Sequence, residues 1–492
     1  MRKIMNQRST AAIRGLLCLA FVVSLVQPAS ALRKRQPWDA ETRTQPDAQA
    51  GGWYINLGII GARAMIRLEA PRILKVMYVF DDTPAAGTLK VGDKITGANG
   101  QPFSQDHKFG YGVDFFGYEG PMMDFGNALE ASQAKTDGKL TVQLTRDKKP
   151  MTVELALPTK YGAYGKNYPY DCKKTDLVLE DLYAYLLKMQ RDDGGWHGRP
   201  HINAFAALAL LASDDPAHLP AAKKAAEYCA RETNDTISYG GLDCWKYGLY
   251  GAYLAEYYLI TREEWVLPEL EEINRWLVKA QMENGGWGHR PANRPGGNGY
   301  GAINVITMQA KMAWALMQRC GIKVDAKRYA ATHDFVARGT NDIGYVWYKD
   351  GGRQNPKYAD MGRTGASAVA HYVSPIGGDT YREFAKLNAS CIGNNPTTFP
   401  DTHGSPLLGM AWTGLGALPD AAMFRKLMDH NRWHFALAQC PNGTFYYQPN
   451  RDNNAQDFAA NPRLCASAVT ALILAIKHKR LQMTGAKPIV VE

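Results

Sequence analysis

Residues 281–291 read QMENGGWGHRP, and a closely similar phrase, QRDDGGWHGRP, occupies residues 190–200. A third, more diverged copy, QCPNGTFYYQP, lies at residues 439–449. Each copy begins with Gln, reaches Gly four residues later and places an aromatic residue two positions beyond that Gly. A phrase that returns along a chain indicates a repeat architecture, in which each copy belongs to one structural unit.

The stretches around the phrases alternate between two kinds of predicted helix. One kind is amphipathic and carries charges, which is typical of an outer layer, and the other is rich in Ala and Gly and apolar all round, which places it inside a fold. The pairs are 177–190 with 201–212, 221–241 with 248–260, 268–281 with 302–320, 328–345 with 364–373, 381–391 with 403–418, and 423–439 with 464–479. Six such hairpins predict an inner ring of six helices within an outer ring of six, over residues 176–480.

The repeated phrase itself predicts how an outer helix ends. Gly194 and Gly285 favour the left-handed conformation that terminates a helix. Gln190 and Gln281 are placed to hydrogen-bond the loop backbone, and the Trp of each copy is expected to pack back under the turn.

The spacing Leu-x3-Gln-x3-Gly-x-Trp, which ends at Trp196 and again at Trp287, resembles the QW motif of terpenoid cyclases. The whole region is similar to the α/α toroid that these cyclases share with protein prenyltransferases. The third copy has Phe445 in place of Trp, so the motif marks the fold more than a reaction. A structural role is favoured for Trp196 and Trp287, and stacking on a ligand is the alternative.

Residues 51–158 precede the repeats and differ from them in character. The run TPAAGTLKVGDKITGANG at residues 83–100 mixes turn residues with β-forming ones, and its Asn-Gly is a hairpin signal. This stretch resembles a bacterial PDZ domain, which implies a small β-rich module whose loop binds a peptide carboxylate. The residues that match this loop are Leu57, Gly58, Ile59 and Ile60. An insertion at residues 104–124 departs from the PDZ pattern, and a structural module packed on the ring is the alternative to peptide capture.

The first 31 residues predict a secretory signal peptide. They carry four basic residues and no acidic one, an apolar run at residues 15–27 and Ala-Ser-Ala at residues 29–31. An uncleaved membrane anchor is the alternative, and no later stretch is apolar for long enough to span a bilayer. The mature chain is therefore expected to be exported, to the periplasm or outside the cell. A leader at residues 32–50, a linker at residues 159–175 and a C-terminal tail at residues 481–492 complete the predicted organisation.

Charge and cysteine content exclude several classes of protein. The formal charge of +10 falls to +6 when the four basic residues of the signal are removed, and no nucleic-acid signature is present, so we expect no nucleic-acid partner. Seven of the eight cysteines remain after signal removal, without a Cys-x-x-Cys pair. This spacing predicts neither a zinc ribbon nor a redox pair, and buried, inert thiols are the favoured interpretation.

Candidate functional residues gather in the turns that lead from outer to inner helices, at the mouth of the predicted ring. Polar groups also prefer helix starts for structural reasons, which explains part of this gathering. The candidates for catalysis are His403, Tyr358, Arg363, His289 and Asp243. The candidates for ligand binding are Trp196, His197, His201, Trp287, Arg290 and Tyr300.

These residue types suit an acidic glycan. Its cleavage needs a cation that neutralises a uronate and a Tyr or His that moves protons. A hydrolase with paired carboxylates would draw on Asp243, Asp360 and Asp401. A terpene cyclase would need an Asp-x-Asp-Asp motif, which the chain lacks. A prenyltransferase would need zinc ligands, and the adjacent Asp243 and Cys244 make a poor pair, so neither a metal nor a cofactor is predicted.

The order of a signal peptide, a PDZ-like module and an α/α toroid also resembles secreted bacterial proteins of uncharacterised function, which implies a fold and a compartment but no catalytic residue. The first predicted function is an exported binding or scaffold protein, with a module that binds a peptide or protein C-terminus and a ring mouth that binds a glycan or other small ligand. The second is a carbohydrate-active lyase or hydrolase that uses the mouth. An isoprenoid-modifying enzyme is the weaker alternative.

Overall fold

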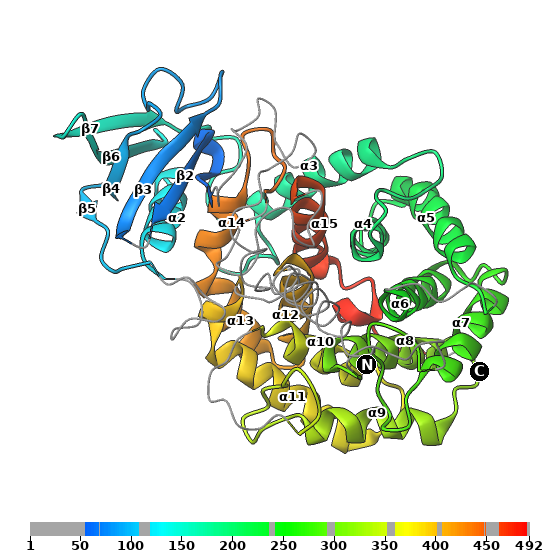
Figure 1. Cartoon of the computed structure of the whole chain (residues 1–492). Helices are drawn as coiled ribbons and strands as arrows, with labels where there is room; N and C mark the ends of the chain where they lie inside the picture. Colours follow the sequence, from blue (N-terminus) through cyan, green and yellow to red (C-terminus); the bar gives the residue numbers. More distant parts are fainter. Residues whose placement is uncertain are drawn as a thin grey trace, which may run out of the picture.

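A computed structural model describes residues 55–67, 69–107, 119–235, 242–292, 301–351, 360–400, 406–446, 448 and 462–489. These residues form an antiparallel sheet with one long helix, followed by a ring of helices (Figure 1). The signal peptide predicted at residues 1–31 and the leader at residues 32–50 lie outside the described residues and stay predictions.

The sheet has the strand order β1-β2-β3-β4-β6-β7, and β5 pairs with β4 alone. The elements of this first part of the chain, in order, are β1 (Ile55–Asn56), η2 (Gly58–Ile60), β2 (Ala62–Arg67), β3 (Ala70–Val79), β4 (Lys94–Ala98), β5 (Gln101–Pro102), α2 (Pro121–Gln133), β6 (Lys139–Arg146) and β7 (Lys149–Ala156). Asn99 and Gly100 join β4 to β5 with φ values of 50° and 79°, which confirms the hairpin expected there. The PDZ resemblance itself stays a prediction.

Within the described ranges, six outer-to-inner helical pairs build the ring. The outer helices are α3 (Lys173–Met189), α5 (Leu219–Glu232), α7 (Val266–Ala280), α9 (Ala326–Arg338), α11 (Gly378–Asn394) and α13 (Ala421–His430) with α14 (Arg432–Ala438). The inner helices are α4 (Pro200–Leu211), α6 (Asp243–Thr261), α8 (Asn304–Arg319), α10 (Gly362–Tyr372), α12 (Pro406–Gly416) and α15 (Pro462–Leu474). Each inner helix contacts the next, and α15 returns to α4, so the ring is closed as the α/α toroid prediction requires.

Side chains from inner helices that are not neighbours meet in the interior of the ring. Phe205 of α4 and Trp412 of α12 pack edge to face with ring centroids 5.4 Å apart, although α15 separates these two helices around the ring. Both side chains are fully buried. The ring therefore encloses a packed core at this level. We call the end at which the inner helices begin the mouth.

The C-terminal segment covers the other end of the ring. It contains η5 (Ala475–His478) and η6 (Gln482–Thr484), and Leu481 and Met483 are fully buried. The backbone N–H groups of Gln482 and Met483 donate to the two carboxylate oxygens of Glu256 in α6, both at 2.9 Å. Residues 481–484 of the tail predicted at residues 481–492 are thus part of the core.

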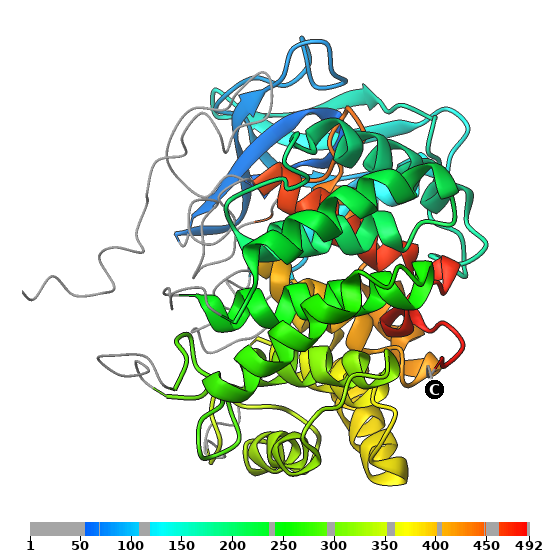
Figure 2. The ribbon, with the colours of Figure 1, turned by 90° about the vertical axis from the view of Figure 1, so that its right-hand side faces the viewer.

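The last outer helix, predicted as one element, bends at Asn431 and so consists of α13 and α14. The bend lets α14 lie against both η2 and α2, and Figures 1 and 2 show the sheet at this side of the ring. A Cβ on Gly126 would lie 2.5 Å from the carbonyl oxygen of Trp433, and one on Gly58 would lie 2.8 Å from that of Ala436. Absent side chains at these two glycines therefore permit backbone-to-backbone packing between the two parts.

The linker predicted at residues 159–175 is packed between the sheet and the ring. Tyr164 and Tyr168 are buried, with ring centroids 4.6 Å apart. The N–H of Tyr164 donates to the carboxylate of Glu130 in α2. The same carboxylate forms a buried ion pair with Lys174 at the start of α3, with an N–O distance of 2.6 Å. These contacts make the connection a structural part of the interface.

Candidate functional site

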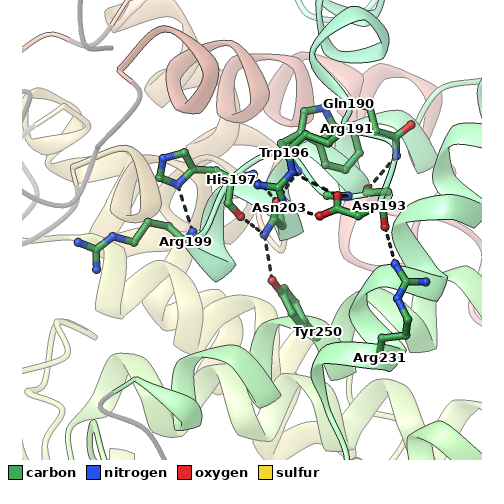
Figure 3. A network of polar contacts seen from close by, with 11 residues as sticks. Gln190, Arg191, Asp193, Trp196, His197, Arg199, Asn203, Arg231 and Tyr250 are labelled. Atoms are coloured by element: carbon green, nitrogen blue, oxygen red, sulfur yellow. Dashed lines mark hydrogen bonds and ion pairs between the residues drawn. The ribbon is translucent and has the colours of Figure 1, made fainter. Parts of the chain in front are cut away.

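The repeated phrase builds the turns at the mouth in one recurring way, shown for its first copy in Figure 3. Gln190 donates from Nε2 to the carbonyls of Gly194 and Ala221, both at 2.9 Å, and so ties its own turn to α5. Trp196 turns back and donates from Nε1 to the carbonyl of Leu186, at 2.8 Å. The predicted roles of the Gln and Trp residues in this copy are therefore confirmed.

The second copy repeats these contacts. Gln281 donates from Nε2 to the carbonyls of Gly285 and Arg328, at 3.0 and 3.1 Å. Trp287 donates from Nε1 to the carbonyl of Leu277, at 3.1 Å. Because the two copies make equivalent contacts, we conclude that the phrase joins one outer helix to the next.

The glycines of the phrase act differently from the prediction. The two outer helices end at the residue before each Gln. Gly194 and Gly285 lie four residues after that Gln, with φ values of 91° and 92°. A Cβ at these positions would lie 2.1 Å from the carbonyl oxygen of Lys224 and 2.3 Å from that of Ala331, on the next outer helices. Glycine is therefore required for a turn pressed onto its neighbour, as well as for its left-handed conformation.

A polar side chain on each of four inner helices secures the turn, and sequence reasoning missed it. The N–H of Trp196 donates to Oδ1 of Asn203 at 2.7 Å, and Nδ2 of Asn203 donates to the hydroxyl of Tyr250 at 3.1 Å (Figure 3). The equivalent acceptors are Thr307 for Trp287, Thr364 for Val346 and Ser467 for Phe445. An Asn, Thr or Ser within the first two turns of an inner helix was the available signal. The hydrogen bond from Val346 also identifies a fourth turn of this kind, before α10, whose sequence does not match the repeated phrase.

The two Trp residues of the phrases are placed for packing, which argues against the ligand-binding role also predicted for them. Trp287 is fully buried and Trp196 is buried, and the Trp287 ring meets that of Trp314 edge to face at 4.9 Å. Both indole N–H groups are already used within the turns. A ligand would have to displace core contacts to reach either ring.

The two histidines predicted in the first turn lie close to the start of α4. His197 is partly buried and its Nδ1 accepts the N–H of Arg199 at 3.1 Å (Figure 3). His201 is buried in the first turn of α4. Both histidines therefore lie at the mouth, and the side chain of His197 also stabilises its own turn. Their role in ligand binding stays a prediction.

The most suggestive pair at the mouth is Trp245 with His289. Trp245 lies in the first turn of α6 and is only partly buried, and His289 lies within the phrase at residues 281–291. Trp245 donates from Nε1 to Nδ1 of His289 at 2.9 Å, and the two rings stack at 5.8 Å with a 27° angle between their planes. Burial, and then the neighbouring charge of Arg290, lower the pKa of His289. Arg290 itself is exposed.

A carboxylate and an ammonium group accompany Trp245 in the same helical turn. Asp243 is buried at the start of α6, and its Oδ1 lies 3.8 Å from Nζ of Lys246. An acid in the first turn is favoured by the helix dipole, so this position of Asp243 also has a structural reason.

Arg363 is held inside the fold, which corrects its assignment as a cation for substrate. It is 4% exposed and its Nη1 lies 2.8 Å from Oδ2 of Asp360. It also donates to the carbonyl of Val346 and to the hydroxyl of Tyr345, at 3.2 and 3.0 Å. Arg363 therefore fixes the turn before α10, and its charge is matched by a buried carboxylate.

Three predicted site residues, Tyr300, Tyr358 and His403, lie outside the described residues, as does Asp401. Among the side chains that the structure does describe, no group of three or more His, Cys, Asp or Glu residues is arranged to hold a metal ion. No described helix is long and apolar enough to cross a membrane. All seven cysteines after residue 171 are free and buried, which confirms their interpretation as buried thiols.

The four loop residues matched to a PDZ carboxylate site are also buried. Leu57, Ile59 and Ile60 pack into the core cluster that contains Trp433, Ala436 and Leu437 of α14. The backbone of Gly58, which is also buried, lies against Ala436. The surface predicted to receive a peptide is thus covered by a helix of the same chain. This arrangement favours the alternative of a structural module packed on the ring.

The helical part is similar to several solved structures at low identity. An α-1,6-mannanase, GH76A of Salegentibacter sp. HEL1_6, has 13% identity and a TM-score of 0.44, covering 62% of this chain and 98% of that one. The type II terpene cyclase MstE from Scytonema has 15% identity and a TM-score of 0.42, covering 62% and 99%. A possible member of the GH105 family from Salmonella enterica serovar Paratyphi A has 14% identity and a TM-score of 0.44, covering 61% and 93%.

No curated relative matches this chain. Residues 175–485, which span the ring from its first outer helix to the C-terminal segment, match the model of a domain of unknown function, DUF6288. Because the match covers more than half of the chain, the protein belongs to the DUF6288 family.

Proposed function

We propose that the protein is an exported carbohydrate-active enzyme, a lyase or hydrolase, that acts on an acidic glycan at the mouth of the ring. The observation that carries the proposal is the partly exposed indole of Trp245, stacked beside His289 where the inner helices begin. An aromatic face offers a flat apolar surface to the C–H groups of a sugar, and a few polar groups around it give orientation. Export rests on the predicted signal peptide.

The charges near this pair suit an acidic substrate. Arg290 is exposed next to His289, and Lys246 lies one position beyond Trp245 on α6. A cation placed beside a uronate carboxylate stabilises the negative charge that develops when a proton leaves the adjacent carbon. Tyr358 and His403 remain the candidates for moving protons.

A glycan-binding protein without turnover is the second candidate. Two buried carboxylates at the mouth face a cation, since Asp243 lies near Lys246 and Asp360 pairs with Arg363. Cations of the same chain thus already contact these two carboxylates, which favours binding of a glycan without proton transfer from them. Peptide capture by the PDZ-like module is not proposed, because α14 covers the matching loop.

Turnover by the purified chain from residue 32 onward would test the proposal. Polygalacturonate, alginate and a neutral mannan would be followed by the ultraviolet absorbance of unsaturated products and by release of reducing ends. Replacing Trp245 with Ala should lower kcat/KM at least about tenfold, because an aromatic contact with substrate is lost. The matched control is Trp265→Ala. The indole of Trp265 is also partly buried, but it donates a hydrogen bond to Glu263 just after the C-terminal end of α6, away from the mouth.

Three results would each decide something. Turnover that depends on Trp245 but not on Trp265 would support the enzyme. Binding of the same glycans in calorimetry without products would favour the second candidate. Turnover that is equal in both variants would place the reaction elsewhere and would overturn the proposal.

A further inference from the structure

The hydrogen bond between Trp245 and His289 restricts the protonation state of the imidazole. An indole Nε1 is only ever a donor. The atom that receives this bond, Nδ1 of His289 at 2.9 Å, must therefore present a lone pair. A charged imidazolium carries a proton on both nitrogens and could not accept the bond, so the geometry requires the neutral ring.

A neutral imidazole has one proton, and in His289 it must reside on Nε2. The stacked arrangement with Trp245 also holds the plane of the ring, with 27° between the two planes. Two further features favour the neutral form, because burial and the charge of Arg290 both lower the pKa of His289. Among the charged groups of the adjoining turns, Asp243 and Lys246 lie on α6 and offset each other at 3.8 Å.

We propose that Trp245 fixes His289 as the neutral tautomer with its proton on Nε2, so that His289 serves a glycan as a hydrogen-bond donor and does not act as a base. The oxygen it would address is a carboxylate or hydroxyl oxygen of the sugar, since these accept an N–H bond. The first half of this proposal is independent of the function, and the donor role rests on the proposed glycan site.

Nuclear magnetic resonance of the whole mature chain, labelled with 15N-histidine, tests the tautomer without any ligand. The signals of His289 are assigned by their loss in His289→Gln. We expect an unprotonated type of Nδ1 and a protonated type of Nε2 near neutral pH, with a titration midpoint below the ordinary value of 6.5. A proton found on Nδ1 would overturn the proposal.

Two variants separate the hydrogen bond from the stacking. Trp245→Phe keeps an aromatic ring but removes the N–H, so His289 should populate both tautomers and its midpoint should rise. Trp265→Phe removes an indole N–H that bonds Glu263 instead, and it should leave the His289 signals unchanged. Unchanged signals in Trp245→Phe would show that Trp245 does not set the tautomer.

The donor role is tested by binding of sodium tetragalacturonate, with mannotetraose as the uncharged probe. Gln can offer an N–H near the place of Nε2, whereas Leu cannot. A donor role predicts that His289→Leu weakens binding about tenfold and that His289→Gln stays within about threefold of the wild type. Equal losses in both variants would contradict it. If neither probe binds the wild type, the proposed glycan site fails with the donor role, while the nitrogen signals still decide the tautomer.

Discussion

The main chain of Asn56 exchanges two hydrogen bonds with the side-chain amide of Gln448, 392 positions further along the chain. Its N–H donates to Oε1 of Gln448 at 3.0 Å, and its carbonyl accepts from Nε2 at 3.1 Å. The side chain of Asn56 in turn donates to the carbonyls at the end of α14, including Leu437 at 2.9 Å. The first strand of the sheet is therefore bound to the last turn of the ring, and the two parts form one packed body.

Adding a methyl group between α2 and α14 should loosen this body. Gly126→Ala would place a Cβ 2.5 Å from the carbonyl oxygen of Trp433 in a rigid backbone contact. We expect a loss of about 1–3 kcal/mol of unfolding free energy, the usual cost of overpacking. Thermal or denaturant unfolding would measure it. Gly198→Ala is the control, because a Cβ there meets nothing within 4 Å. Equal effects of the two changes would refute the close approach.

The Gln residues of the phrases should differ in importance. Gln281 donates to two carbonyls and accepts from Arg328 at 3.2 Å. Gln439 is fully buried, and neither polar atom of its side chain has a hydrogen-bond partner among the described residues. Gln281→Leu should cost about 1–3 kcal/mol of stability because it leaves buried groups unpaired. Gln439→Leu should be neutral or stabilising, since it removes an unpaired buried amide. Denaturant unfolding compares them, and a larger loss at Gln439 would be the contrary result.

The ring was predictable because each of its parts leaves a local signal. The apolar composition of helices such as 201–212 and 464–479 predicts that they are buried, and the repeated phrases indicate where outer helices end. The Asn99-Gly100 hairpin is equally local. The bend at Asn431 was not predictable, because it depends on contacts of α14 with η2 and α2, which lie far earlier in the chain.

The site was harder to predict, because residue type does not reveal a partner. Arg363 has the charge that a uronate needs, yet its nearest carboxylate is Asp360, three positions away and buried with it. Trp245 lacks a repeated motif, although its contact with His289 is the pairing that distinguishes the mouth. A polar residue near the start of an inner helix is predicted to lie at the mouth. Whether its side chain can contact a ligand depends on tertiary contacts that the sequence does not reveal.

The pH dependence of stability should reveal Glu256 beneath the C-terminal segment. Burial outweighs its two backbone hydrogen bonds and raises the pKa of this carboxyl from 4.5 to about 7. Its contribution to stability is therefore full below the unfolded value and is lost as pH rises through about 7. The stability of the wild type relative to Glu256→Gln should fall by about 3 kcal/mol over this range. Denaturant unfolding at several pH values would measure it, with the exposed Glu283→Gln as control. A flat difference would contradict the assignment.

The pair of Asp360 and Arg363 should behave as a buried ion pair, whose loss is worst when only one partner is removed. Arg363→Met leaves the carboxylate of Asp360 buried without its cation, which should cost about 3–5 kcal/mol of unfolding free energy. Asp360 has φ 59°, a conformation that Asn tolerates, so Asp360→Asn removes the charge without backbone strain.

The double variant should therefore be more stable than Arg363→Met alone, even though both lose the hydrogen bonds to Val346 and Tyr345. Unfolding of the two single variants and the double variant completes the cycle. If the two losses simply add, the charges do not interact, and the assignment of Asp360 and Arg363 as a buried ion pair fails. If the double variant recovers stability, the role of Arg363 is to hold the turn before α10, and any loss of turnover in Arg363→Met follows from that turn.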